Sequence, residues 1–78
     1  MKRTNCFVVV NADDMPDFCG TYETREDVFE HYERYPSFTG RTFTSLRSAR
    51  REANNLDRQL EIGATCYVVC GVYCKELA

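Results

Sequence analysis

The sequence predicts a small α+β sandwich of two layers, in which two helices pack on one face of a three- to four-stranded sheet that is antiparallel or mixed. Two patterns carry this prediction: apolar residues at helical spacing within residues 45–60, and short β-branched segments at residues 5–11 and 65–74. The length also bounds the fold. With 78 residues the chain has room for a single domain, residues 1–78, with a core of modest size.

The N-terminal part of the chain predicts two strands. Residues 5–11, NCFVVVN, are β-branched and aromatic, which is typical of a buried strand. Residues 12–17 contain Pro16 among aspartates and indicate a turn. Residues 18–23 then alternate between two faces, so we expect them to return beside the first strand as a hairpin.

A first helix is expected over residues 25–35. Thr24 and Asp27 have the spacing of a capping box. Pro36 ends the helix because the residue before a proline is pushed out of the helical region. The exposed side of this helix carries three glutamates, which we call the acidic ridge: Glu26, Glu30 and Glu33.

A second helix is expected over residues 45–60, after a short edge strand or an extended linker at residues 37–44. Thr44 or Ser45 can supply the N-cap, and Gly63 lies just beyond the C-terminal end. The residues expected to face the core are Leu46, Ala49, Ala53, Leu56 and Leu60. The opposite side carries four residues that we call the basic ridge: Arg47, Arg51, Asn54 and Arg58. Arg50 and Arg41 are expected near it.

The last strand, residues 65–74, is apolar on both faces, so we expect it at the centre of the sheet and beside residues 5–11. Cys66, Cys70 and Cys74 in this strand are spaced C-x3-C-x3-C. In a strand, successive members of this set are about 13 Å apart, which is too far to share one metal ion. The spacing therefore favours core cysteines, and a bridge from Cys6 to one of them is left open.

The net charge of −2 conceals two oppositely charged halves of the chain. Residues 12–35 contain eight acidic residues and two arginines, a net charge of −6. Residues 36–60 contain five arginines and two acidic residues, a net charge of +3. Eight of the ten basic residues are arginine, which suits contacts with carboxylates or phosphates, although a coding bias would give the same ratio.

The sequence contains none of the common catalytic motifs. It lacks a P-loop, a dinucleotide-binding glycine motif, a C-x2-C pair and a nucleophile elbow. His31 is the only histidine, and we expect it to be solvated. Asp13, Asp14 and Asp17 lack the spacing of a calcium loop and are expected to form a polar turn. We therefore expect a protein that is not an enzyme and holds no cofactor.

The N-terminus does not read as a signal peptide, because its apolar run covers only residues 6–10 and is followed at once by aspartates. No apolar run is long enough to span a bilayer. Five cysteines are an odd number, which fits reduced thiols better than a fully paired disulfide scaffold. We expect a cytoplasmic protein with no membrane partner.

In size and build the chain is similar to the small α+β accessory proteins that phages and mobile elements encode, anti-CRISPR proteins among them. The similarity concerns only size and general architecture and rests on no sequence motif, so it assigns no role to any residue. It implies a protein that binds and blocks a host protein.

The leading hypothesis is a non-catalytic inhibitor or adaptor that docks on a larger protein, such as a host nucleic-acid-handling or defence complex, through its charged helix faces. One alternative is a nucleic-acid-binding module that uses the basic ridge. The sequence pI near 5.3 argues against this alternative. Others are a metal or redox protein built on the cysteines, and an acidic mimic of nucleic acid. A homodimer is also left open. The residues predicted to bind a partner are Arg41, Arg47, Arg50, Arg51, Asn54, Arg58, Glu26, Glu30 and Glu33.

Overall fold

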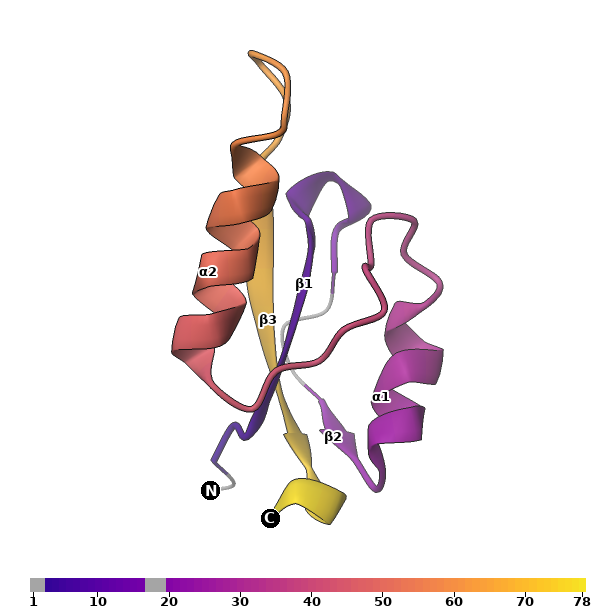
Figure 1. Ribbon diagram of the computed structural model, residues 1–78. Coiled ribbons are helices and arrows are strands. Elements are labelled where there is room, and N and C mark those ends of the chain that lie inside the picture. Colours follow the sequence, from indigo (N-terminus) through magenta and orange to yellow (C-terminus); the bar gives the residue numbers. More distant parts are fainter. Residues whose placement is uncertain (1–2, 17–19) are drawn as a thin grey trace.

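The computed structural model describes residues 3–16 and 20–78, and it shows a mixed sheet of three strands between two helices (Figure 1). The strands are β1 (Cys6–Asn11), β2 (Thr21–Tyr22) and β3 (Tyr67–Cys74). The helices are α1 (Arg25–Tyr32) and α2 (Leu46–Asp57), and two short 3-10 helices follow β1 and β3, η1 (Ala12–Asp14) and η2 (Lys75–Leu77). The predicted α+β class and the mixed sheet are confirmed.

β3 is the central strand, as its two apolar faces predict. The strand order is β1-β3-β2, with β1 antiparallel to β3 and β2 parallel to it. The register runs from the pair Cys6 and Val72 to the pair Asn11 and Tyr67. The predicted pairing of residues 5–11 with the last strand is therefore confirmed.

The predicted hairpin between residues 5–11 and 18–23 is wrong. β2 contains only Thr21 and Tyr22 and pairs with β3, on the side of β3 away from β1. The outer edge of β1 is occupied instead by Phe43, whose backbone exchanges two hydrogen bonds of 2.8 Å with Phe7. Residues 37–44 thus form a linker that, in the described part of the chain, pairs with the sheet only through the β-bridge between Phe43 and Phe7. Phe18, which the hairpin included, lies outside the described residues.

The two helices pack against opposite faces of the sheet. Successive residues of a strand point to opposite faces. Val8 belongs to a core cluster with Val28 of α1, whereas Val9 belongs to a second cluster with Ala49 and Ala53 of α2. The expectation of two layers with both helices on one face is therefore not confirmed, and the order of layers is α2, sheet, α1 (Figure 1).

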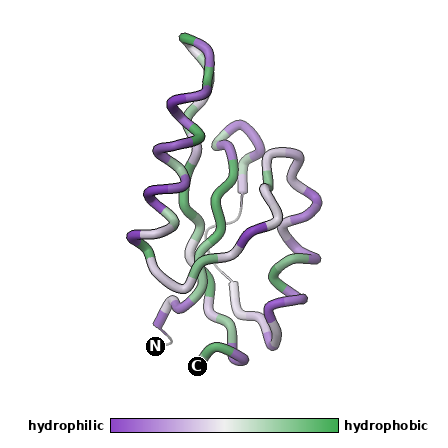
Figure 2. The backbone as a smooth tube through the Cα atoms, viewed as in Figure 1, coloured by the Kyte–Doolittle hydropathy of each residue, from purple (hydrophilic) through white to green (hydrophobic). Residues whose placement is uncertain are grey.

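The physical reason is that apolar residues follow one another along β1 and β3 (Figure 2), and successive residues of a strand point to opposite faces of the sheet. Val8, Val9 and Val10 follow one another in β1 and are all fully buried. A single layer of helices would leave one of these apolar faces in water. Burying both requires cover on both sides, since apolar surface removed from water stabilises the fold by about 25 cal/mol per Å².

α1 begins with the predicted capping box. The Thr24 hydroxyl accepts a hydrogen bond from the Asp27 N–H at 3.2 Å, and the Asp27 carboxylate accepts one from the Thr24 N–H at 3.3 Å. The helix ends at Tyr32, three residues earlier than the predicted 25–35. Tyr35 instead closes a tighter turn on the Tyr32 carbonyl, because Pro36 disfavours helical geometry at the residue before it.

α2 begins at the predicted N-cap, where the Ser45 hydroxyl accepts a hydrogen bond from the Ser48 N–H. It ends at Asp57 and not at residue 60. The Asp57 carboxylate accepts a hydrogen bond of 2.7 Å from the backbone N–H of Tyr67, which ties the end of α2 to the start of β3.

Gly63 does not end α2 as predicted. Its φ of +89° places it in the left-handed region, but it lies in a separate turn in which the Ala64 N–H bonds the Glu61 carbonyl at 3.1 Å. A positive φ at the third residue of such a turn favours glycine. The glycine therefore shapes the loop between α2 and β3, which projects beyond the sheet in Figure 1.

Candidate functional site

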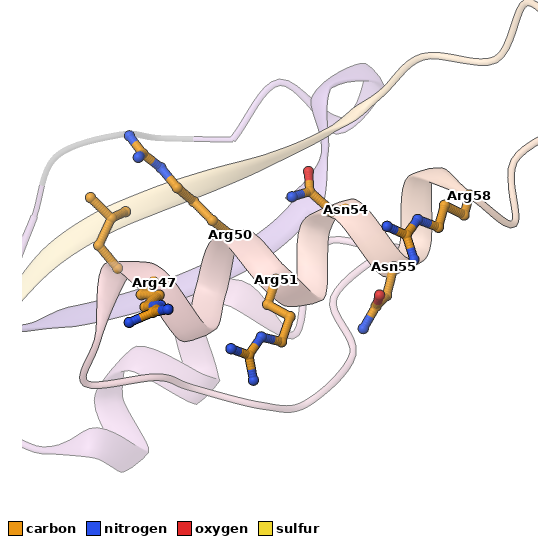
Figure 3. A pocket seen from close by; sticks show the side chains of 7 residues that line it. Arg47, Arg50, Arg51, Asn54, Asn55 and Arg58 are labelled. Carbon is orange, nitrogen blue, oxygen red and sulfur yellow. The ribbon is translucent and has the colours of Figure 1, made fainter.

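The outer face of α2 presents a shallow, open depression of about 580 Å³ (Figure 3). Ala49 and Ala53 are buried on the inner face of the helix and hold it against the sheet. The depression, on the opposite side, is lined by six polar residues and one apolar residue: Arg47, Arg50, Arg51, Asn54, Asn55, Arg58 and Leu46. We call it the α2 depression.

The side chains spread to both sides of the helix axis. In Figure 3, Arg50 and Asn54 point to one side of α2, while Arg51 and Asn55 point to the other. The structure thus brings five of the predicted residues into one site: Arg47, Arg50, Arg51, Asn54 and Arg58.

The positive charge of this site is not neutralised by an ion pair within the part of the chain that the structure describes. Arg47, Arg50, Arg51 and Arg58 are exposed, and none forms an ion pair with any residue that the structure describes. Their field extends about 8 to 10 Å into solvent at physiological salt. The site is therefore suited to an anionic partner.

Arg41, the fifth predicted basic residue, lies outside the α2 depression. It forms an ion pair of 2.6 Å with Glu52, and its guanidinium carbon lies 5.5 Å from the centroid of the Phe43 ring. Arg41 and Phe43 line a second, smaller depression that shares Arg51 and Asn55 with the first. The two depressions are adjacent, but Glu52 offsets the charge of Arg41.

The acidic ridge lies elsewhere. Glu26, Glu30 and Glu33 are exposed on or at the end of α1, which packs against the other face of the sheet from α2. The structure therefore does not bring the acidic and basic ridges together within one molecule.

Two residues of the α2 depression were missed by the sequence analysis. Asn55 follows Arg51 by one helical turn, so the i, i+4 spacing could have found it. Leu46 was expected in the core, but it is 40% exposed. The core beneath α2 is built around Ala49 and Ala53 with Leu56 beside them, so the first residue of the helix is left at its margin.

The cysteines that the structure describes fit the predicted structural role with one exception. Cys6, Cys70 and Cys74 are buried, whereas Cys66 precedes β3 and is exposed. Burial raises the pKa of the Cys6 thiol, and the neighbouring Cys74 raises it further. A buried thiol with a raised pKa is a poor nucleophile. Among residues 3–16 and 20–78, no group of three His, Cys, Asp or Glu residues is placed to hold a metal ion.

The expectation that His31 is solvated is wrong. Its ring is half-buried among aromatic side chains, with ring centroids 4.8 Å from Tyr32, 5.6 Å from Tyr22 and 6.1 Å from Tyr35. Tyr22 comes from β2, so the pattern of α1 alone could not place the histidine in this cluster.

The aspartates after β1 accept hydrogen bonds from distant segments. The Thr65 hydroxyl donates to Asp13 at 2.6 Å, and the Ser37 backbone N–H donates to Asp14 at 3.1 Å. These contacts tie η1 to two loops, as a structural polar turn would. Asp17, the third member of the predicted turn, lies outside the described residues.

Comparison with protein-family models, curated proteins and solved structures finds no match to this chain. Within the described ranges, none of the helices has the length and apolar character needed to cross a membrane. The fold and the site together define a small α+β domain with one basic, exposed helix face.

Proposed function

We propose that this protein is a non-catalytic interaction protein that docks on an acidic surface of a larger protein through the outer face of α2, and acts there as an inhibitor or adaptor. One observation carries the proposal: four exposed arginines line one depression and have no ion-pair partner in the part of the chain that the structure describes. The planar guanidinium group binds carboxylates through two parallel hydrogen bonds, so such a face suits a partner rich in Asp and Glu.

The rigidity of α2 supports this role. The helix is held by the buried Ala49 and Ala53, by the Ser45 cap and by the hydrogen bond from Tyr67 to Asp57. Little backbone freedom would be lost on binding, which favours affinity. Leu46 adds an exposed apolar contact at one end of the same depression, and protein interfaces combine such contacts with a polar rim.

The test is a pull-down from nuclease-treated lysate of the native host. The bait is compared with a double variant, Arg47→Glu and Arg51→Glu, and with a control of equal charge change, Arg3→Glu and Arg34→Glu. Arg3 and Arg34 are exposed and lie outside the α2 depression. We expect a protein that the native chain and the control retain and the α2 variant loses. A partner retained equally by all three folded baits would contradict the proposal.

A second candidate, a nucleic-acid-binding module, is favoured by one further observation. Asn54 and Asn55 stand among the arginines of the α2 depression, and Arg and Asn side chains can form paired hydrogen bonds with the edges of guanine and adenine, respectively. The acidic ridge is on the far side of the sheet, so it would not face a nucleic acid bound to α2.

Fluorescence anisotropy with labelled duplex and single-stranded DNA tests this candidate. A nucleic-acid module would lose affinity steeply as salt is raised, because bound phosphates release counterions, and Arg47→Glu would weaken binding further. Equal weak binding by the native chain and by Arg47→Glu at every salt concentration would exclude it.

A further inference from the structure

The acidic and basic ridges have the same layout on their helices. Glu26 and Glu30 stand at positions i and i+4 of α1, and Glu33, the C-cap of the helix, follows at i+7. Arg47, Arg51 and Asn54 stand at i, i+4 and i+7 of α2, and Arg58 follows one turn later. At about 1.5 Å per residue the acidic ridge is roughly 10 Å long and the basic ridge roughly 16 Å, so the first fits within the second.

Both ridges point away from the sheet. On α1 the buried pair is Val28 and Tyr32, and on α2 it is Ala49 and Ala53. At about 100° per residue, each ridge lies on the side of its helix opposite the buried pair. Each is therefore a free outer surface of one of the two outer layers.

Among residues 3–16 and 20–78, neither ridge is neutralised by an ion pair. In the described part of the chain, the three glutamates of α1 and the arginines of α2 form no ion pair. The sheet lies between the two helices, so the ridges of one copy cannot meet each other. Within the described residues each ridge thus has no ion-pair partner, and a second copy of the same chain would supply one.

We infer that this protein self-associates head to tail, with the acidic ridge of α1 in one copy seated on the basic ridge of α2 in the next. The two surfaces are different patches on opposite sides of the molecule, so the contact is heterologous and each added copy leaves one ridge of each kind free. The assembly therefore grows as an open chain. This inference goes beyond the proposed partner on α2, because its occupant is a second copy of the protein, which would compete with that partner for the same face.

Two short helices bury less surface than a standard interface, so the association is weak and depends on charge. Sedimentation velocity is the first measurement. At about 0.01 M salt, where the Debye length is about 30 Å, we expect the weight-average mass to rise with protein concentration without stopping at the dimer. At about 1 M salt we expect the monomer mass of 9.1 kDa. A monomer at every concentration in low salt, a dimer end point, or association that persists in high salt overturns the inference.

Charge reversal identifies the surfaces. One variant carries Arg47→Glu and Arg51→Glu, and the other carries Glu30→Arg and Glu33→Arg, which are near the C-terminal end of α1, where positive charge is favoured. Each variant alone should remain monomeric in low salt. An equimolar mixture should associate, and so should a chain with all four changes, because each restores opposite charges across the contact.

A loss of helix structure could not produce this rescue, and circular dichroism confirms that each variant is folded. If either single-ridge variant still associates, or if the mixture stays monomeric, the proposed contact is wrong. The pull-down on α2 has its own control, so it can fail or succeed without deciding this inference.

Discussion

The side chain of Asn5 makes two hydrogen bonds with the backbone of Cys74. The Asn5 Nδ2 donates to the Cys74 carbonyl at 2.9 Å, and the Asn5 Oδ1 accepts from the Cys74 N–H at 2.8 Å. β1 begins at Cys6, which pairs with Val72, so Cys74 extends beyond the ladder that β3 forms with β1. Asn5 takes the place of a missing strand residue and satisfies backbone groups at a buried position.

We expect Asn5→Ala to lower the free energy of unfolding by about 1 to 3 kcal/mol, because it leaves both backbone groups of Cys74 without their partner. Urea denaturation at neutral pH measures the change. Asn54→Ala is the control, since Asn54 is exposed on α2 and its loss should change stability by less than about 0.5 kcal/mol. Equal effects of the two substitutions would show that the Asn5 contacts do not stabilise the end of the sheet.

The elements with strong local patterns were predicted from the sequence. The apolar residues of YVVCGVYC gave β3 and its central place, and the spacing of Ala49, Ala53 and Leu56 gave α2. β2 was not recognised correctly because it is two residues long and pairs with Tyr73 and Cys74, about fifty positions away in the chain. Pairing over such a separation leaves no local signal.

The expected layer arrangement was not confirmed, although the sequence contained a signal for a different one. Each helix shows which of its own faces is apolar, but not which face of the sheet it covers. The run Val8, Val9, Val10 in β1 is apolar on both faces, and both faces turn out to be covered. Two apolar faces on a strand predict cover on both sides of the sheet.

That arrangement makes Val8 and Val9 equally sensitive to a polar substitution. Val8→Thr and Val9→Thr each place a hydroxyl of nearly the same shape in a fully buried position, one under α1 and the other under α2. We expect each to destabilise the fold by about 1 to 3 kcal/mol, unless the hydroxyl finds a partner. Thermal unfolding followed by circular dichroism gives both values. If only one of the two is costly, one face of β1 is open to water and the three-layer order is wrong.

The sequence predicted the part of the candidate site that lies on a single helix. Arg47, Arg51 and Arg58 were grouped correctly because residues on one helix are placed by local spacing alone. The pairing of Arg41 with Glu52 joins a linker to a helix, so it depends on tertiary packing that the pattern does not contain.

The two faces of α2 predict opposite responses to a new carboxylate. Ala53 is 6% exposed, so Ala53→Asp would bury an uncompensated charge, and we expect a loss of about 3 to 5 kcal/mol, enough to unfold a small domain. Arg51 is exposed, and Arg51→Glu should change stability by less than about 0.5 kcal/mol. Melting temperatures measured side by side test the helix orientation. Equal melting temperatures would contradict it.

The raised pKa of Cys6 predicts a loss of stability in alkaline solution. Burial disfavours the thiolate, and the neighbouring Cys74 disfavours it further, so the folded state holds the Cys6 proton more tightly than the unfolded chain does. The protonated Cys6 thiol therefore contributes to the stability of the fold, and this contribution is fully present below the ordinary cysteine pKa of about 8.5. This contribution is lost as the pH rises towards the raised pKa of Cys6 in the folded state, because in that range only the unfolded chain gains free energy by ionising the thiol.

Urea midpoints of the native chain and of Cys6→Ala, measured from about pH 7 to above pH 9, test this prediction. Cys6→Ala should be less stable at neutral pH, because it removes a buried side chain, but its stability should fall less steeply as the pH rises. Tyrosines and the other cysteines are present in both proteins, so the difference between the two slopes reports Cys6. If both proteins lose stability at the same rate, the Cys6 thiol ionises as readily in the folded state as in the unfolded chain, and its burial has no effect on its pKa.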